Sequence, residues 1–126
     1  MITTKRLAST IGLLLLVRAT LFAVGWAKTF GGLRDETASS VQQTVDSGYV
    51  VAGNSEDGAW LIRIDATSLV SWQKTYSAGS VRDVNQNADG SYIVAGTTSL
   101  GAGGNDMWVL KLDGSGNVEW EKSYGL

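Results

Sequence analysis

The stretch Trp72-Gln73-Lys74-Thr75-Tyr76 occurs three times in the chain in closely related form. Each copy consists of tryptophan, any residue, lysine, threonine or serine, and an aromatic ring. The other two copies are Trp26-Ala27-Lys28-Thr29-Phe30 and Trp120-Glu121-Lys122-Ser123-Tyr124. The tryptophans are 72 − 26 = 46 and 120 − 72 = 48 residues apart. A period of this size indicates a repeat architecture.

Composition limits both the class of protein and its chemistry. The 126 residues are 44% apolar and 17% charged, which is typical of one globular domain. Sixteen glycines and no proline indicate many tight turns. The chain has no cysteine, so disulfides and thiolate zinc sites are excluded, and it has no histidine, the commonest general base and metal ligand. A formal net charge of −2 argues against a nucleic-acid partner, because phosphate binding needs clustered lysine and arginine.

Residues 1–25 have the pattern of a secretory signal peptide. Two basic residues precede apolar runs on either side of Arg18, and small residues before the end of the segment suit cleavage after Gly25. Cleavage after Ala27 satisfies the same size rule but would remove Trp26 from the repeat. Neither run has the roughly 20 apolar residues of a spanning helix, so we expect no stable membrane span. We therefore expect a secreted or cell-surface protein; a non-cleaved anchor or a misplaced start codon is the alternative.

Between the tryptophan motifs, two aligned stretches are predicted to form β-hairpins. Asp46-Ser47-Gly48 and Asp89-Gly90-Ser91 stand between β-prone runs, and aspartate and glycine tolerate the left-handed backbone that hairpin turns require. The second run of each hairpin ends in Ala-Gly, at Gly53 and at Gly96. The aligned pairs are Val41 with Val84, Gln43 with Gln86, Asp46 with Asp89, and Tyr49 with Tyr92.

Two more strands complete each repeat. The third, Trp60–Asp65 or Trp108–Asp113, alternates incompletely between apolar and polar residues, so we expect it to be central and covered on both sides. The fourth, Leu69–Tyr76 or Val118–Tyr124, contains the tryptophan motif, and its lysine indicates an outer edge strand. The residues expected to share one face of the fourth strand are Val70, Trp72, Lys74 and Tyr76, and in the other copy Val118, Trp120, Lys122 and Tyr124.

Four short antiparallel strands in 46–48 residues match the spacing of a propeller blade. The sequence resembles a family of secreted bacterial and archaeal repeat proteins, whose unit runs Trp-x-Lys-Thr-aromatic-Gly-Gly, then Asp-Gly-Gly-Tyr-Ile-Val-Ala-Gly, then Gly-Ala-Gly-x-x-Asp-x-Trp-Val-x-Lys-Leu-Asp-x-x-Gly. The close matches are Lys28–Gly32, Tyr92–Gly96 and Gly101–Asp113. The first full unit departs from this pattern, because Asn54–Ala59 replaces the longer glycine-rich loop and Ser77-Ala78-Gly79 replaces Gly-Gly. The resemblance implies a surface or secreted β-propeller without assigned chemistry.

The expected fold is all-β, with two four-stranded antiparallel propeller-type blades, about 33–76 and 80–124, and a surplus strand at 26–30. Propellers close with about four to eight blades, so two blades leave apolar faces bare. Either missing blades or a homo-oligomer, such as a trimer forming a six-bladed ring, would be needed to close a ring. Three motif copies for two blades favour a fragment of a longer propeller over a self-assembling module.

Several stretches resemble functional sites, but each has a simpler structural interpretation. The spacing Asn85-x-Asn87-x-Asp89-Gly90 and the stretch Asp113–Asn117 partly match a calcium loop, yet both lack its twelfth-position glutamate and are predicted to be hairpin turns. Leu100–Asp106 is rich in glycine but lacks the Gly-Lys-Ser/Thr of a phosphate loop. The adjacent carboxylates Asp35 with Glu36, and Glu56 with Asp57, are expected to be solvated turn residues rather than a glycosidase pair.

The regular recurrence of the tryptophans favours packing over ligand stacking. No catalytic, cofactor-binding or metal-binding residue is therefore expected. The expected function is a non-catalytic scaffold that displays loops to an unknown protein or glycan. The alternatives are a sugar-binding lectin formed by oligomerising two-blade chains, and a hydrolase with its site at the centre of a complete propeller. The structural repeat positions are Trp26, Lys28, Tyr49, Gly53, Trp60, Trp72, Lys74, Tyr92, Gly96, Trp108, Trp120 and Lys122.

Overall fold

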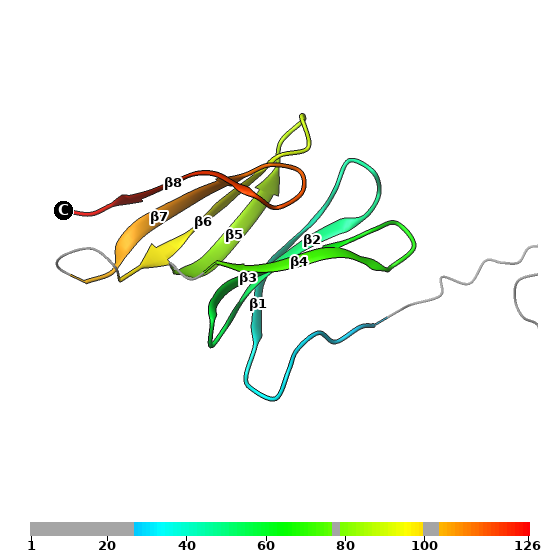
Figure 1. Cartoon of the computed structure of the whole chain (residues 1–126), viewed down its shortest axis with the longest axis horizontal. Helices are drawn as coiled ribbons and strands as arrows, with labels where there is room; N and C mark the ends of the chain where they lie inside the picture. The colour runs from blue at the N-terminus through cyan, green and yellow to red at the C-terminus, as the bar shows by residue number, and fades with distance from the viewer. Residues whose placement is uncertain (1–26, 77–78, 100–103) are drawn as a thin grey trace, which may run out of the picture. The chain divides into compact units, whose positions relative to one another are not determined.

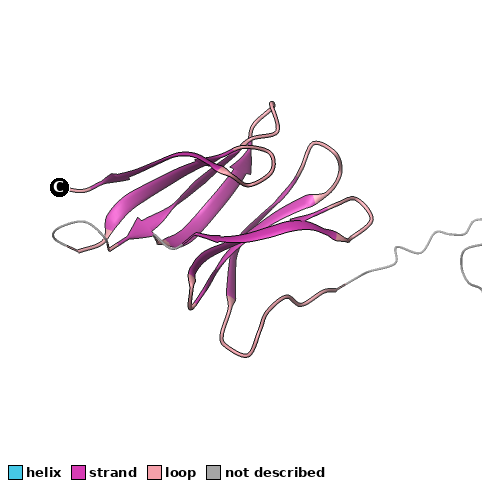
Figure 2. Ribbon diagram, viewed as in Figure 1, coloured by secondary structure: helices cyan, strands magenta, loops and turns pink. Residues whose placement is uncertain are grey.

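Eight β-strands and no helix form the regular structure of the described residues, which are 27–76, 79–99 and 104–126 of this computed structural model (Figure 2). Residues 1–25, the expected signal peptide, lie outside the described residues. The strands are β1 (Thr37–Gln43), β2 (Tyr49–Ser55), β3 (Gly58–Ile64), β4 (Val70–Tyr76), β5 (Ser80–Gln86), β6 (Tyr92–Thr98), β7 (Asp106–Leu112) and β8 (Val118–Tyr124).

Consecutive strands pair antiparallel into two four-stranded sheets (Figure 1). We call them the first sheet, in the order β1-β2-β3-β4, and the second sheet, in the order β5-β6-β7-β8. The expected all-β class with two four-stranded antiparallel sheets is confirmed. The third strand of each sheet is central, and the strand that contains the tryptophan motif lies at an edge, both as predicted.

The second sheet repeats the pairing register of the first. Strands β5 and β6 begin 80 − 37 = 43 positions after β1 and β2, and β7 and β8 begin 106 − 58 = 48 positions after β3 and β4. The 48 − 43 = 5 additional residues lie in the connection between β6 and β7. Cross-strand partners correspond pair by pair at these offsets; for example, Val41 pairs with Val51, and Val84 pairs with Val94. The sequence repeat therefore encodes one sheet geometry twice.

Each edge strand contains one extra residue that interrupts its pairing, a β-bulge. The extra residues are Ser39 in β1, Ser71 in β4, Arg82 in β5 and Glu119 in β8. The bulge in β4 corrects one prediction: Trp72 pairs with Arg63 whereas Val70 pairs with Ile64, so Val70 does not share the face of Trp72. The same shift separates Val118 from Trp120. A bulge changes the side-chain alternation, and simple period-two counting does not include it.

Four of the six connections inside the sheets use the same five-residue turn, at 44–48, 65–69, 87–91 and 113–117. In each turn the first N–H donates to the fifth carbonyl and the fourth N–H donates to the first carbonyl, over 2.8–3.1 Å. The fourth residue has a positive φ: Ser47 69°, Ser68 70°, Gly90 87° and Gly116 82°. This is a type I turn followed by a left-handed residue, a common short hairpin connection. The first sheet therefore holds serine where the second holds glycine.

The recurring glycines at the end of the hairpins allow a close approach of two strands. A Cβ at Gly53 would collide with the carbonyl oxygen of Thr37, and a Cβ at Gly96 would collide with that of Ser80. Both contacts lie beside the bulge of the first strand of each sheet. Glycine is therefore required at these two positions by the same local geometry.

The two sides of each sheet can be assigned from the residues that pair across the ladders. The side that bears Lys74 in the first sheet and Lys122 in the second is here called the lysine face, and the other side the back face. In the first sheet, residues on the lysine face are Val50, Ala52, Ala59, Leu61, Arg63, Trp72, Lys74 and Tyr76. In the second sheet, residues on the back face are Val84, Tyr92, Val94, Trp108, Leu110 and Leu112. These two sets supply most of the buried core.

The strand expected at 26–30 is not formed over its described residues, 27–30. A β-strand needs a neighbour with which to exchange hydrogen bonds. The ladders of the described residues pair β1 to β8 only with one another, within the two sheets. Trp26 lies outside the described residues, and Lys28 is exposed in a segment without regular structure.

Candidate functional site

The main concentration of specific contacts lies where the lysine face of the first sheet meets the back face of the second. Strand β5 contacts β1, β2 and β3. The buried apolar residues form one cluster across this junction, including Val50, Ala52, Ala59 and Leu61 from the first sheet and Val84, Tyr92, Val94, Trp108 and Leu110 from the second. Removing this apolar surface from water is what holds the sheets together.

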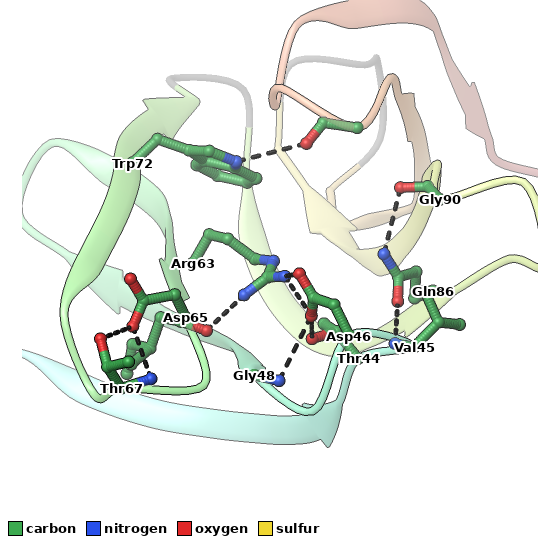
Figure 3. Close-up of polar contacts among 12 residues, drawn as sticks. Thr44, Val45, Asp46, Gly48, Arg63, Asp65, Thr67, Trp72, Gln86 and Gly90 are labelled. Atoms are coloured by element: carbon green, nitrogen blue, oxygen red, sulfur yellow. Dashed lines mark hydrogen bonds and ion pairs between the residues drawn. The ribbon is translucent and has the colours of Figure 1, made fainter.

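The tryptophan motif of β4 contacts the turn between β7 and β8. The Trp72 indole N–H donates to the carbonyl of Gly114 over 3.3 Å (Figure 3), and the Trp72 ring stands edge-on to Tyr92 with centroids 5.9 Å apart. Lys74 Nζ donates to the side-chain oxygen of Asn117 over 2.6 Å. The motif therefore contacts the second sheet through an edge-on ring contact with Tyr92 and through hydrogen bonds to the β7–β8 turn.

Tyr76, the last residue of the motif, is buried and donates its hydroxyl to the carbonyl of Gly116 over 2.7 Å. Burial raises the pKa of Tyr76 well above its usual value, and the negative charge of Asp113 adds to the rise. The hydroxyl therefore stays protonated and continues to donate this bond at alkaline pH.

A buried arginine joins the β1–β2 turn to the second sheet; Figure 3 shows its contacts with Asp46 and Ile64. Arg63 is 7% exposed; its Nη2 contacts both carboxylate oxygens of Asp46, and its Nη1 donates to the carbonyl of Ile64. Its Nε donates to the Tyr92 hydroxyl over 3.0 Å. Arginine stays charged in proteins, so a buried guanidinium needs such partners. The sequence signal was a basic residue inside a strand predicted to be covered on both sides.

Asp46 is held as a carboxylate by several donors. The hydroxyl of Thr44 donates to it over 2.6 Å, and the N–H of Gly48 donates over 3.3 Å. These two hydrogen bonds, followed by those of Arg63, lower the pKa of Asp46 from 3.8 to about 2. Asp46 thus braces its own turn and neutralises the arginine. It does not have the raised pKa of a general acid.

Amide side chains fix the junction further by pairing with backbone groups. Asn54 donates its side-chain N–H to the carbonyl of Val81 over 3.2 Å and accepts the N–H of Val81 over 2.7 Å. The N–H of Gln86 donates to the Gln42 side chain over 2.6 Å, and the Gln86 side chain accepts the N–H of Val45 over 2.9 Å. Because these bonds are directional, they set the register of one sheet on the other.

The stretches that partly match calcium loops are hairpin turns, as predicted. Asp113 accepts the N–H groups of Ser115 and Asn117, each over 2.9 Å, and Asp89 accepts that of Ser91 over 3.0 Å. Hydrogen bonds lower the pKa of both aspartates. The described residues contain no cluster of three or more side chains able to hold a metal ion. Residues 100–103 of the glycine-rich loop lie outside the described residues.

The adjacent carboxylates are on exposed loops. Glu56 forms an ion pair with Arg34, and both side chains are largely exposed. Glu36 accepts the N–H of Gly32 over 3.2 Å, a contact within its own loop. Neither arrangement forms a pair of carboxyl groups facing each other across a cleft.

A shallow hollow of about 380 Å³ lies on the outer part of the first sheet, lined by Trp60, Gln73, Lys74 and Thr75. Trp60 is half-buried there. Its counterpart Trp108 is buried and donates its indole N–H to Glu121 over 2.8 Å. The two recurring tryptophans of the third strands therefore have different environments.

The fourth-strand motif likewise differs between the sheets. Trp120 is exposed in β8, where Lys122 Nζ lies 6.0 Å from its ring centroid. The equivalent residues of β4, Trp72 and Lys74, contact the second sheet instead. Gly116 also contributes to the junction, because it lies close to the Trp72 ring. The sequence did not predict this role, since the contact joins positions 116 − 72 = 44 residues apart.

No protein-family model matches the sequence, and the comparison with curated proteins finds no match. Within the described residues, we find no helix with the length and apolar character needed to cross a membrane.

Proposed function

We propose that the protein is a non-catalytic interaction scaffold of the β-propeller type, secreted or held at the cell surface, whose loops contact a protein or a glycan. The observation that carries this proposal is the repetition of one sheet, with the same strand order, register, bulges and turns. Stacking of one such sheet on the next, lysine face to back face, is the arrangement that a propeller repeats around its axis.

The engagement of the polar groups supports a structural rather than a catalytic role. The arginine buried at the junction is neutralised by Asp46 and bonded to Tyr92. The turn aspartates have lowered pKa values and accept backbone N–H groups. A hydrolytic site would need an acid or base with a free position facing a substrate.

The connection between β6 and β7 is the best candidate for a contact loop. It comprises residues 99–105, whereas β2 and β3 are joined by residues 56–57 alone. Insertions of this kind on a rigid scaffold are common places for binding residues. The loop also contains the segment that resembles the glycine-rich loop of the repeat family.

The test compares the wild-type chain with a chain in which residues 99–105 are replaced by Glu-Asp, the connection of the first sheet. Both are screened on a glycan array and against a panel of extracellular proteins. A display scaffold should bind at least one probe, and the shortened chain should lose that binding while keeping its strand content and melting temperature. Turnover of a glycoside, ester or peptide substrate that Glu36→Gln or Glu56→Gln abolishes would contradict a non-catalytic role.

Secretion has its own test. Expression of the full chain in a bacterial host should release protein into the periplasm or medium, and N-terminal sequencing should identify Trp26 as the first residue. Protein that retains residues 1–25 would argue for the anchor alternative.

The hollow at Trp60 favours a second candidate, a sugar-binding lectin. An indole ring beside an amide, a hydroxyl and an ammonium group offers a stacking surface and polar partners for a saccharide. Binding of a glycan that quenches tryptophan fluorescence, and that Trp60→Ala abolishes but Trp120→Ala does not, would support this function. Glycan binding that survives Trp60→Ala would exclude this hollow as the site.

A further inference from the structure

Two faces meet in the junction: the lysine face of the first sheet and the back face of the second sheet. The equivalent face on the other sheet has exposed residues in each case. On the lysine faces, Tyr76 is 8% exposed but its counterpart Tyr124 is 54% exposed, and Ala59 is 0% exposed but its counterpart Met107 is 62% exposed. On the back faces, Val84 is 2% exposed but its counterpart Val41 is 63% exposed. The second sheet thus bears an uncovered lysine face. On the back face of the first sheet Val41 is exposed, whereas Ile62 and Ile64 are buried within the single chain.

The junction is heterologous, because two different faces meet. The lysine face of one sheet receives the back face of the next, and each sheet has one face of each kind. A surface of this kind can continue from molecule to molecule in a head-to-tail manner. We propose that the lysine face of the second sheet binds the back face of the first sheet of a second copy of this chain.

The backbone groups needed for this contact are present. The turn at 65–69 has the same internal hydrogen bonds as the turn at 113–117. When the turn at 65–69 of the second copy docks in the same way, the carbonyl of Ala66 lies at the indole N–H of Trp120. This is the position that the carbonyl of Gly114 has at Trp72 inside the chain. The same docking places the carbonyl of Ser68 at the hydroxyl of Tyr124, as Gly116 lies at Tyr76.

Several side chains correspond as well. Gln43 of the second copy takes the place of Gln86, whose side chain accepts the N–H of Val45. Tyr49 of the second copy takes the place of Tyr92. Its neighbour is Lys111 of the first copy, which takes the place of Arg63. The apolar residues that would be covered are Val41, Val51 and Trp60 of one copy and Ile93, Met107, Val109 and Tyr124 of the other.

Some counterparts fit less well, and we therefore expect the contact between copies to be weaker than the contact inside the chain. A Cβ at Gly116 would lie 2.9 Å from the Trp72 ring, and the counterpart of Gly116 is Ser68, whose β-carbon would crowd Trp120. The counterpart of Asn117, which bonds Lys74, is Leu69. Replacing Ser68 by glycine should therefore strengthen association.

The experiment uses two matched variants of the full chain. Met107→Lys blocks the lysine face of the second sheet, and Val41→Lys blocks the back face of the first. The two positions have nearly equal exposure, and each substitution would place an ammonium group in an otherwise apolar contact. Because both residues are exposed in the single chain, folding should be retained, which circular dichroism and thermal melting check.

Light scattering and analytical ultracentrifugation, over a wide range of protein concentration, give the result. Wild-type chain should form assemblies larger than a monomer, each variant alone should be monomeric, and an equimolar mixture of the two variants should form a capped 1:1 dimer. The mixture is decisive, because it contains one intact lysine face and one intact back face and so can make one junction and no more.

Three outcomes would overturn the proposal. Wild-type chain could remain monomeric at all concentrations, the mixture could remain monomeric while the wild type assembles, or Met107→Lys could abolish assembly while Val41→Lys leaves it intact. The last would indicate lysine faces paired with each other. As a check independent of these lysines, Ser68→Gly should lower the concentration at half-association about tenfold by relieving the crowding at Trp120; unchanged or weaker association would also count against the proposed docking.

Discussion

The two sheets have the same backbone but different surroundings. Strand for strand, the second sheet repeats the register, the bulges and the turns of the first. Yet Leu61 is fully buried on the lysine face of the first sheet, whereas its counterpart Val109 is half-exposed on that of the second. Local sequence therefore determines the shape of a sheet, while the neighbouring sheet determines what each residue contributes to stability.

The largest expected difference between the sheets concerns equivalent core positions. Leu61→Ala should lower the free energy of unfolding by about 2–5 kcal/mol, because it leaves a cavity in the junction. Val109→Ala should lower it by about 1 kcal/mol or less, because much of that side chain is already in water. Urea unfolding at a protein concentration too low for association measures both. Equal losses would mean that the lysine face of the second sheet is covered in solution.

Two turn glycines have nearly the same backbone conformation but different surroundings. Gly90 and Gly116 have φ values of 87° and 82°, but a Cβ at Gly90 would meet nothing within 4 Å, whereas one at Gly116 would press on Trp72. Gly90→Ala should cost about 1–2 kcal/mol for the left-handed conformation alone. Gly116→Ala should cost a further 1–3 kcal/mol or so through overpacking and should alter the near-ultraviolet circular dichroism of Trp72. Similar losses for the two variants would show that the turn moves freely away from the ring.

A smaller difference is expected for the tyrosines that end the two motifs. Tyr76→Phe leaves the carbonyl of Gly116 without its buried donor and should cost about 1–2 kcal/mol. Tyr124→Phe removes an exposed hydroxyl and should change stability by less than about 0.5 kcal/mol. Thermal melting of both variants tests this, and a loss from Tyr124→Phe as large as that from Tyr76→Phe would contradict it.

The smallest expected effect is the dependence of stability on pH. The pKa of each turn aspartate, Asp46, Asp65, Asp89 and Asp113, is lower in the folded chain than its ordinary 3.8. Such groups stabilise the fold fully above pH about 4, and this contribution is lost as pH falls through the folded pKa, which is about 2 for Asp46. The urea concentration at which half of the protein is unfolded should therefore decrease as the pH is lowered from about 5 to about 2.

The two equivalent aspartates again allow a comparison. Asp46 has the arginine of the junction as a partner, whereas Asp89 accepts hydrogen bonds from Ser91 of its own turn and is near the charge of Lys111. Asp46→Asn should therefore reduce the acid-induced loss of folding stability more than Asp89→Asn does. The opposite order would mean that the Arg63 contact contributes little in solution.

Much of the fold could be predicted from the sequence, because its causes are local. Alternation and turn residues located the strands, and the lysine of the tryptophan motif correctly placed β4 and β8 at the sheet edges. The bulges at Ser71 and Glu119 could not be predicted, because neither residue type distinguishes a bulge from regular pairing. As a result, Val70 and Val118 were assigned to the wrong face.

The junction was less predictable, because its contacts join distant positions. Val41 and Val84 are aligned valines in similar runs, yet only Val84 is buried. Arg63 finds one partner 63 − 46 = 17 positions before it and another 92 − 63 = 29 positions after it, on the other sheet. A single sequence contains no signal for such pairings beyond the need of a buried charge for a counterion.

The bulges at the four sheet edges have a consequence for colloidal behaviour. An open, regular edge strand can recruit a strand from another molecule and start fibrous aggregation. Here β1, β4, β5 and β8 each carry an unpaired extra residue that bends the strand and breaks the ladder of available donors and acceptors. Uncontrolled growth by strand addition is thereby discouraged at β1, β4 and β8, while the N–H groups of Val81 and Gln86 in β5 are already bonded to side chains of the first sheet.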